Sequence, residues 1–407
     1  MSKKLQGLVL FSSILIVIFA VIGGLGVHAS SNNDGAYTHI QVYSEVLYHI
    51  RAEYVEEPNM SSVTNGALHG LLESLDANSS YLSPAEYKTY KQKKNDGKAD
   101  IGAMVSKRFG YAAIVSVIPG GPTDKAGIAS GDIIEAIEGK NTHDMSLAEI
   151  RSRLSGDAGS KVEISVIRAR KVEPQKVTIT KEIVAPPAAQ EQMMADNVGY
   201  IKALALTKGK SQEIAAKVKA LQKEGAKKLI LDLRNTAEGE EDEGVAVANL
   251  FLNHGLISYL QGQKYPKVPF NADPQKKITD LPLMVMVNRG TAGAAEIVAA
   301  AILENARGDV LGDKTFGDGS IQKLIEVPDG SALILSIAKY YTPNGKVIQE
   351  NGITPNILVA STDDLVAAVS DDDDGSTPSA EPQKPQPKDD EQLHKALEAL
   401  KNKTPKS

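Results

Sequence analysis

Apolar residues in the middle of the chain form short unbroken runs that alternate with amphipathic segments. Residues 227–234 and 281–288 each contain an unbroken apolar run, 229–231 and 283–287, whereas residues 211–225 and 294–306 place apolar side chains at helical spacing. Unbroken apolar strands are typical of a parallel sheet whose two faces are covered by helices. The pattern therefore predicts an α/β core over residues 187–360, built on a mostly parallel sheet.

The region before this core has a different periodicity. Residues 30–96 carry apolar side chains at helix-like spacings, among them Ile40, Val46 and Ile50, and this predicts an N-terminal helical region. Residues 97–186 instead contain short β-like runs punctuated by glycine and proline, with one helical segment between two of them. That pattern predicts a small mixed α/β module.

The start of the chain has the features of a targeting segment. Lys3 and Lys4 precede an apolar run from Leu8 to Val27, which is followed by small residues in "VHAS". These features indicate an export signal over residues 1–29, and the run is also long enough to remain as a membrane anchor. We therefore expect the rest of the chain to be exported, either periplasmic or anchored outside the cytoplasmic membrane. The membrane is a partner if the segment stays uncleaved.

The other end changes composition. Residues 361–407 are acidic and rich in proline up to the amphipathic stretch "EQLHKALEALK", which predicts a disordered linker and a short final helix. Periodicity does not separate internal core from an interface with a second copy of the chain. This ambiguity applies to two sets of apolar residues, Val42, Leu47 and Leu68 near the start, and Leu393, Leu397 and Leu400 near the end.

Composition removes several classes of function. A formal net charge of −6 gives no broad cationic character, so nucleic acid is not an expected partner. The absence of cysteine excludes disulfides, thiolate catalysis and Cys-ligated zinc. The seven histidines are scattered, and neither an HExxH motif nor a carboxylate pair at ligand spacing occurs. We therefore expect no metal and no cofactor.

An ordered series of motifs carries a family resemblance. The series is "SLDANSSYLSP", "VIPGGPTDKAGIASGDIIEAIEGK", "ILDLRNTAEGEEDEGVAVANLFL", "GDKTFGDGSIQ" and "AKYYTPNGKVIQENGITPN". In this order it resembles the carboxyl-terminal processing peptidases (S41 serine peptidases), and the match covers residues 36–401. The resemblance implies an α/β multidomain protein with a PDZ domain over residues 97–186 and an S41-type core over residues 187–360.

The same resemblance implies a degenerate catalytic dyad. In that family a lysine takes the proton of a serine nucleophile, and a glutamine orients the lysine. The stretch "TAGAAEI" puts Gly293 in the serine slot, while "FGDGSIQ" puts Asp318 in the lysine slot and Gln322 in the glutamine slot. Glycine has no side-chain nucleophile, and aspartate is not the same base in the same geometry. The resemblance therefore implies a catalytically inactive relative, a pseudopeptidase.

The backbone slots for the oxyanion are Gly239 and Ala294. The family's Asn-Pro-Gly-Gly turn is replaced here by residues 236–239, "TAEG", which brings in Glu238. A working hole stabilises the negative charge that develops in the transition state, and a carboxylate beside it opposes that charge. The altered turn therefore also favours a catalytically inactive relative.

Two alternatives remain open. Thr291 lies two residues from the nucleophile slot and is the candidate hydroxyl of an active C-terminal endopeptidase with a non-standard nucleophile. Lys314 and Ser320 are polar residues near the base slot, more typical of a surface lysine and a turn residue. The second alternative is a structural assembly subunit.

The PDZ resemblance implies a peptide-binding site. A PDZ domain adds an extended peptide end to a sheet edge, and a loop of backbone N–H groups holds the terminal carboxylate. We therefore expect peptide or protein C-termini as partners, and a homo-oligomer or an active homologue as further ones. Asp100 replaces the loop's usual first glycine, which is expected to weaken carboxylate capture. The expected binding residues are Asp100, Ile101, Gly102, Ala103, Leu147, Ile150 and Arg151.

Overall fold

The computed structural model describes residues 34–96, 99–108, 110–168, 171–360, 390–401 and 403. The predicted export segment and most of the predicted acidic linker lie outside these residues. Among the residues described, no helix combines the length and the apolar character needed to cross a membrane.

Contacts divide the chain into two compact units, one ending at Ala67 and the other beginning at Leu68. The described part of the first unit contains α2 (Asp34–Glu53) and the start of α3 (Met60–Glu73), so the predicted N-terminal helical region is confirmed. On α2, Val42 is exposed and Leu47 is half-buried.

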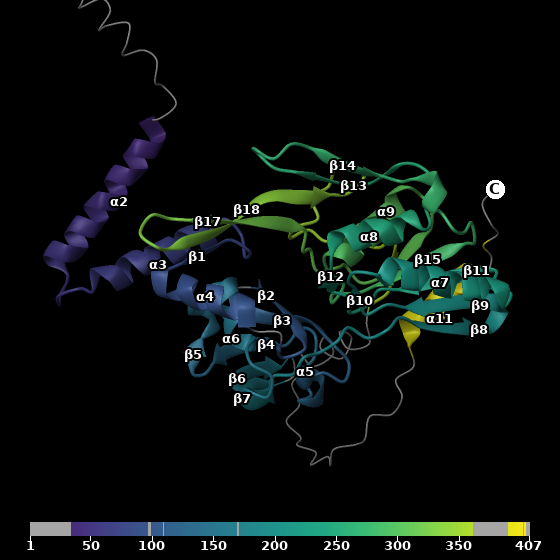
Figure 1. Cartoon of the computed structure of the whole chain (residues 1–407), viewed down its shortest axis with the longest axis horizontal. Helices are drawn as coiled ribbons and strands as arrows, with labels where there is room; N and C mark the ends of the chain where they lie inside the picture. The colour runs from purple at the N-terminus through teal and green to yellow at the C-terminus, as the bar shows by residue number, and fades with distance from the viewer. Residues whose placement is uncertain are drawn as a thin grey trace, which may run out of the picture. The chain divides into compact units, whose positions relative to one another are not determined.

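The second unit contains a six-stranded sheet in which every neighbouring pair is parallel except the one at the β8 edge (Figure 1). The predicted core with a mostly parallel sheet is therefore confirmed. Its strands, in spatial order, are β19 (Ile357–Leu358), β16 (Asp309–Gly312), β15 (Leu283–Val287), β11 (Lys228–Asp232), β9 (Val198–Lys202) and β8 (Gln190–Met194).

Helices cover both faces of this sheet. The apolar faces of α7 (Lys210–Lys223), α8 (Glu241–Asn249) and α9 (Ala294–Glu304) form one core with strand residues such as Leu231. On the opposite face, α11 (Glu391–Lys401) packs on β9, β11 and β15. The α11 residues Ala396 and Leu400 are fully buried there, with Leu393 and Leu397 packed beside them, so this helix contributes to the internal core.

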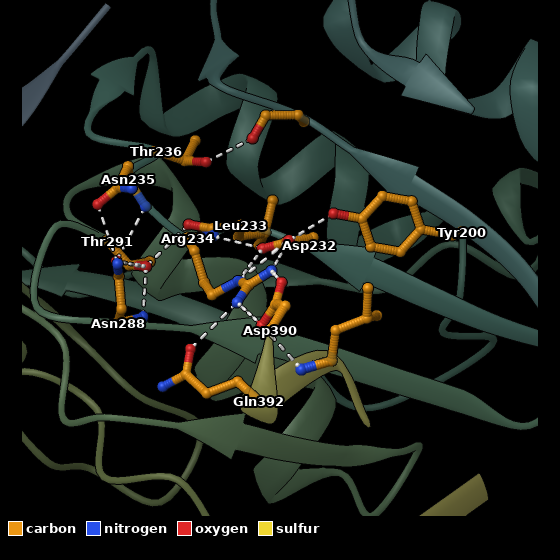
Figure 2. Close-up of polar contacts among 12 residues, drawn as sticks. Tyr200, Asp232, Leu233, Arg234, Asn235, Thr236, Asn288, Thr291, Asp390 and Gln392 are labelled. Atoms are coloured by element: carbon orange, nitrogen blue, oxygen red, sulfur yellow. Dashed lines mark hydrogen bonds and ion pairs between the residues drawn. The ribbon is translucent and has the colours of Figure 1, made fainter. Parts of the chain in front are cut away.

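A cluster of charged side chains joins α11 to the sheet (Figure 2). Asp232, the last residue of β11, is fully buried and accepts hydrogen bonds from the Tyr200 hydroxyl and the Arg234 guanidinium, both at 2.6 Å. Arg234 also donates to both carboxylate oxygens of Asp390, at 2.7 and 2.8 Å, and to Gln392. Planar, two-pronged contacts of this kind suit a guanidinium between carboxylates. The cluster therefore holds the start of α11 against the sheet.

The predicted small α/β module is also present in the second unit, and its core gathers Ile114, Ile134 and Val162. Its sheet has β2 at one edge, and the order is β2 (Ala103–Arg108), β3 (Tyr111–Val117), β4 (Ile133–Ile137), β6 (Lys161–Arg168) and β7 (Lys171–Thr180), with β5 (Lys140–Asn141) paired to β4. Its helices are α5 (Pro122–Lys125) and α6 (Leu147–Leu154).

A third sheet of the second unit is antiparallel. Its order is β1 (Ser80–Leu82), β18 (Ala332–Tyr341), β13 (Leu256–Gln261) and β14 (Val268–Asn271), with β17 (Ser320–Glu326) also paired to β18. The remaining elements are α4 (Pro84–Asp96), the short parallel pair β10 (Ala205–Leu206) and β12 (Glu238–Gly239), and 3-10 turns at Thr142–Asp144, Ala195–Asn197 and Pro274–Lys276.

Candidate functional site

The turn between β15 and α9 presents residue 293 to open space. Gly293 is the N-cap of α9. Its backbone has φ 59° and ψ −123°, a combination that residues with a Cβ rarely adopt. A glycine enters this conformation without steric cost. A Cβ built on Gly293 would have only the Ala237 carbonyl oxygen near it, at 3.9 Å. The sharp turn therefore exposes residue 293 in the way a nucleophile would be exposed, but the residue is a glycine and has no side chain.

Glu296, at the third position of α9, ties this turn to the loop that carries Asp318. Its carboxylate accepts N–H groups of Gly293 at 3.0 Å and of Gly317 and Asp318, both at 2.8 Å, together with the Thr315 hydroxyl. The side chain is fully buried, and burial raises its pKa to about 8 while the hydrogen bonds oppose the shift. Sequence reasoning did not assign this role. The available signal was a lone carboxylate at the N3 position of an alanine-rich helix.

The base slot is occupied by Asp318, whose side chain is half-buried. The Asn78 amide donates to Asp318 at 3.3 Å. Burial raises the pKa of Asp318, and the positive charge of Arg151 opposes part of that rise. Gln322, expected to orient a base, donates instead to the Ser320 hydroxyl at 2.8 Å and the Ser320 carbonyl at 3.1 Å.

The expected oxyanion backbone lies across from this loop. Glu238 and Gly239 form β12, which pairs in parallel with Ala205 and Leu206. A Cβ on Gly239 would come within 2.8 Å of the Leu206 carbonyl, so this close pairing requires glycine. Partial desolvation and the nearby charge of Asp100 raise the pKa of Glu238. Ala294 is the first residue of α9, where backbone N–H groups have no partner within the helix.

One cavity of about 800 Å³ joins the two sites that were predicted separately. It runs from the α/β module to the core, with Asn78, Tyr90, Leu204 and Asn235 among its other walls. The predicted residues that line it are Gly239, Gly293, Asp318, Gln322, Asp100, Ile101, Ala103, Leu147 and Arg151.

Three predicted residues do not line the cavity. Ile150 was expected in the peptide groove, but its side chain is fully buried in the core of the α/β module. The reason is the helical geometry of α6, because Leu147 and Arg151 lie one turn apart on the face toward the cavity while Ile150 faces the sheet. Gly102 and Ala294 are both buried and are not among the residues that line the cavity.

Thr291 is a buried part of the turn (Figure 2). Its hydroxyl donates to the Leu233 carbonyl at 2.8 Å and accepts the Asn288 N–H at 3.0 Å. It does not belong to the described lining of the cavity. Of the other polar candidates, Lys314 is exposed, and the Ser320 hydroxyl accepts the Asn78 amide at 3.0 Å.

The charge inside the cavity is unbalanced. Among the described residues that line it, the carboxylates of Asp100, Glu238, Glu241 and Asp318 face a single guanidinium, that of Arg151. Burial, and repulsion from Asp318 and neighbouring acids, raise the pKa of Glu241. In the part of the chain that the structure describes, no group of three or more His, Asp or Glu side chains is arranged to hold a metal ion.

Comparison with protein families gives two matches along the chain. Residues 197–359 match peptidase family S41. Residues 114–168 match the PDZ domain family. The S41 match begins at β9 and ends just after β19, so it covers five of the six strands of this sheet and the helices α7, α8 and α9, while β8 and α11 lie outside it. The PDZ match runs from β3 to β6 and includes α6.

Individual relatives of the chain are named carboxy-terminal processing proteases. The chain is 30% identical over 335 residues to a carboxy-terminal-processing protease of Bartonella bacilliformis, covering 81% of this chain and 77% of that one. It is 31% identical over 335 residues to the carboxy-terminal processing protease CtpA of Bacillus subtilis, covering 82% and 71%. A solved photosystem II D1 C-terminal processing protease has a similar fold, with a TM-score of 0.65, 24% identity and coverage of 79% of this chain and 92% of that one.

Proposed function

The chain belongs to peptidase family S41, and we propose that it binds extended peptide or protein segments in its cavity without cutting them. The observation that carries this proposal is the combination of an intact backbone frame with altered side chains. The turn at Gly293, the Glu296 clamp and the close pairing of Gly239 hold their positions around a cavity of about 800 Å³. The nucleophile and base slots on that frame hold glycine and aspartate.

The electrostatics of the cavity also support binding without cleavage. Serine-type hydrolysis needs a hydroxyl nucleophile, a base, and donors aimed at a developing negative charge. Glu238, Glu241 and Asp318 line the same cavity as Gly293, so a developing oxyanion would meet carboxylates. These charges oppose the transition state that the backbone turn would otherwise serve.

The active alternative needs a nucleophile from elsewhere, and Thr291 is its candidate. The Thr291 hydroxyl donates its hydrogen to the Leu233 carbonyl and accepts the backbone N–H of Asn288. Thr291 also lies outside the described cavity lining. Bringing this oxygen to a bound peptide would break both hydrogen bonds and move a fully buried residue, which misplaces the reacting groups. If the chain is a structural subunit, the cavity has no ligand. A measurement of peptide binding distinguishes this alternative from the proposed function.

The proposed location is outside the cytoplasmic membrane. Its support is the sequence pattern of Lys3, Lys4 and the apolar run from Leu8 to Val27, which lies beyond the described residues. Fractionation of cells together with the mass of the mature N-terminus tests it. Recovery of the full-length chain in the cytoplasm alone would contradict the proposal.

A paired binding and cleavage assay tests the function. The full chain is incubated with unfolded proteins that have apolar C-termini, and both retention and fragment formation are followed, with Thr291→Ala as the matched variant. We expect retention without fragments, unchanged by the substitution. Cleavage that Thr291→Ala abolishes would establish the active alternative instead. Absence of retention in both proteins would favour the structural subunit.

Restoration of the dyad sharpens the same test. Space for a side chain at position 293 is open, so Gly293→Ser with Asp318→Lys supplies both missing groups. We expect little cleavage by this double variant, because the Glu238 carboxylate still lines the cavity with residue 293, and more when Glu238→Gly is added. Equal cleavage by the double and triple variants would remove the role assigned to Glu238.

A further inference from the structure

The peptide groove of the PDZ domain lies between β2 and α6. β2 is an edge strand that pairs only with β3 within the module's sheet. Ala103, Met104 and Val105 of β2 and Leu147 and Arg151 of α6 all line the cavity. An extended segment added to this edge would lie in the same cavity as Gly293 and Asp318.

The loop at the start of β2 already contains a carboxylate. Asp100 Oδ1 accepts the backbone N–H of Gly102 at 2.7 Å. Where successive backbone N–H groups form a nest, they hold an incoming anion, and the Gly102 N–H is a donor of this kind. The bond to Asp100 therefore places a side-chain carboxylate of the protein itself where the carboxylate of a bound chain end would compete for the same donor.

The backbone of this loop is held on several sides. The Gly102 carbonyl accepts the Ile118 N–H at 2.9 Å, and Asp100 and Glu182 exchange a pair of backbone hydrogen bonds at 3.0 Å. Gly102 has φ +72°, and a Cβ there would come within 2.8 Å of Pro122. The loop has little room to turn a different N–H toward a ligand.

The surrounding charge has the same sign as Asp100. Glu238 lies near enough to repel it, and Glu241 and Asp318 line the same cavity. The guanidinium of Arg151 is engaged with the Val105 carbonyl, its Nε donating at 3.3 Å, and it faces the charge of Asp318. A free carboxylate entering this space would meet net negative charge, whereas a lysine or arginine side chain would meet complementary charge.

We infer that the groove between β2 and α6 takes an internal, extended segment of a partner protein carrying a basic side chain, and that Asp100 excludes a free C-terminal carboxylate from it. The inference rests on the proposed peptide-binding function and narrows its ligand. Main-chain hydrogen bonds to β2 supply affinity without requiring a chain end. Asp100 acts as a specificity residue, because it satisfies Gly102 internally.

Two random decapeptide pools test the inference. The pools are identical except that one has a free C-terminal carboxylate and the other a C-terminal amide, and both are captured on the immobilised full chain. We expect wild type to retain the amide pool at least as well as the acid pool, with lysine and arginine enriched in what is retained. We expect Asp100→Gly to shift the acid-to-amide affinity ratio toward the acid by about tenfold or more, the range of one charge-assisted hydrogen bond.

Asp124→Gly is the matched control. Asp124 Oδ2 accepts the Gly120 N–H at 2.7 Å, so it makes the same kind of bond in the same module but outside the described cavity lining. This variant is expected to keep the wild-type ratio. Asp100→Asn keeps an acceptor for Gly102 without the charge and serves if the glycine variant fails to fold. Its expected shift is in the same direction and smaller.

The outcomes separate the two proposals. A wild-type preference of about tenfold for the acid pool that Asp100→Gly leaves unchanged overturns the role of Asp100, while peptide binding itself stands. Enrichment of acidic rather than basic residues overturns the assigned ligand charge. Failure of every variant to retain either pool overturns the peptide-binding function, and this inference with it.

Discussion

The loop that follows β11 separates two clusters of charged side chains. On one side, Arg234 lies between the carboxylates of Asp232 and Asp390, and every charged group has an opposite charge within 3 Å (Figure 2). On the other side, the carboxylates of Glu238 and Asp318 share a cavity with one engaged guanidinium. The pKa of Asp390 is lowered by Arg234, whereas the pKa values of Glu238 and Asp318 are raised by desolvation.

The contrast is the one expected between a structural cluster and the proposed binding surface. Matched charges that are buried and hydrogen-bonded fix two elements together, and removing one partner leaves an uncompensated charge. Unmatched carboxylates in an open cavity are not stabilised by the protein itself, so they lower stability and favour a complementary ligand. The following experiments test whether the two clusters differ in this way.

Arg234→Met is expected to produce the largest loss of stability. It leaves the fully buried Asp232 with the Tyr200 hydroxyl but without its cation, and losses of this type amount to about 3–5 kcal/mol. Denaturant unfolding measures the change, and hydrogen exchange in α11 reports whether that helix detaches. Lys395→Met is the control, because the exposed Lys395–Glu398 ion pair lies on the same helix. Its loss should lower the free energy of unfolding by less than about 0.5 kcal/mol. Similar losses in both variants would contradict the structural role.

Glu296→Gln is expected to cost about 2–3 kcal/mol, because an amide NH₂ replaces an oxygen that accepts backbone N–H groups in a fully buried site. The same unfolding measurement applies. A cost below about 0.5 kcal/mol, as at an ordinary surface position, would mean that the clamp does not hold the two slots together.

The pH dependence of this variant follows from the sign of the shift. The pKa of Glu296 is raised to about 8 in the folded protein, so between the ordinary glutamate value and about 8 the folded state holds a proton that the unfolded chain has released. The free energy of unfolding contributed by this group is therefore highest at low pH and falls as pH rises through that window. Asp318 and Glu238 contribute with the same sign, and comparison with Glu296→Gln isolates Glu296. An identical slope in both proteins would contradict the shift.

Gly293→Ala is expected to have the smallest effect, a loss of about 1–2 kcal/mol, since φ 59° disfavours a Cβ while the space around it is open. Gly66→Ala is the matched control. It also meets nothing within 4 Å but lies inside α3, where alanine is favoured, so its stability should rise by about 0.5–1 kcal/mol. A gain at both positions would show that the turn at residue 293 carries no backbone strain.

The fold was largely predictable because its signals are local. Continuous apolar runs anticipated β11 and β15, and the alanine-rich helix after "TAG" is α9. The slots at Gly293, Asp318, Gln322 and Gly239 followed from motif register rather than from periodicity. Their meeting in one cavity with the groove of the PDZ domain was not predictable, because the two regions are joined by packing rather than by spacing.

The residues that were missed or misplaced share one cause. The partners of Glu296 include Gly317 and Asp318, about twenty positions away, so its role is invisible in the local helix pattern. Ile150 and Arg151 are neighbours in sequence, but the turn of α6 sends one into the core and the other to the cavity. The alternatives for Leu400 were resolved by the docking of α11 on the sheet, where Arg234 contacts Asp390 just before the helix.

By itself, the sequence determined which chemical groups this protein has and which it lacks: no serine at residue 293, no lysine at residue 318 and a carboxylate at residue 100. Those absences hold in any fold, because no packing supplies a missing atom. Only the tertiary structure decided what the remaining groups face. Whether a carboxylate is clamped, paired or left unmatched depends on donors brought together from distant parts of the chain, and on how much water the surrounding atoms exclude.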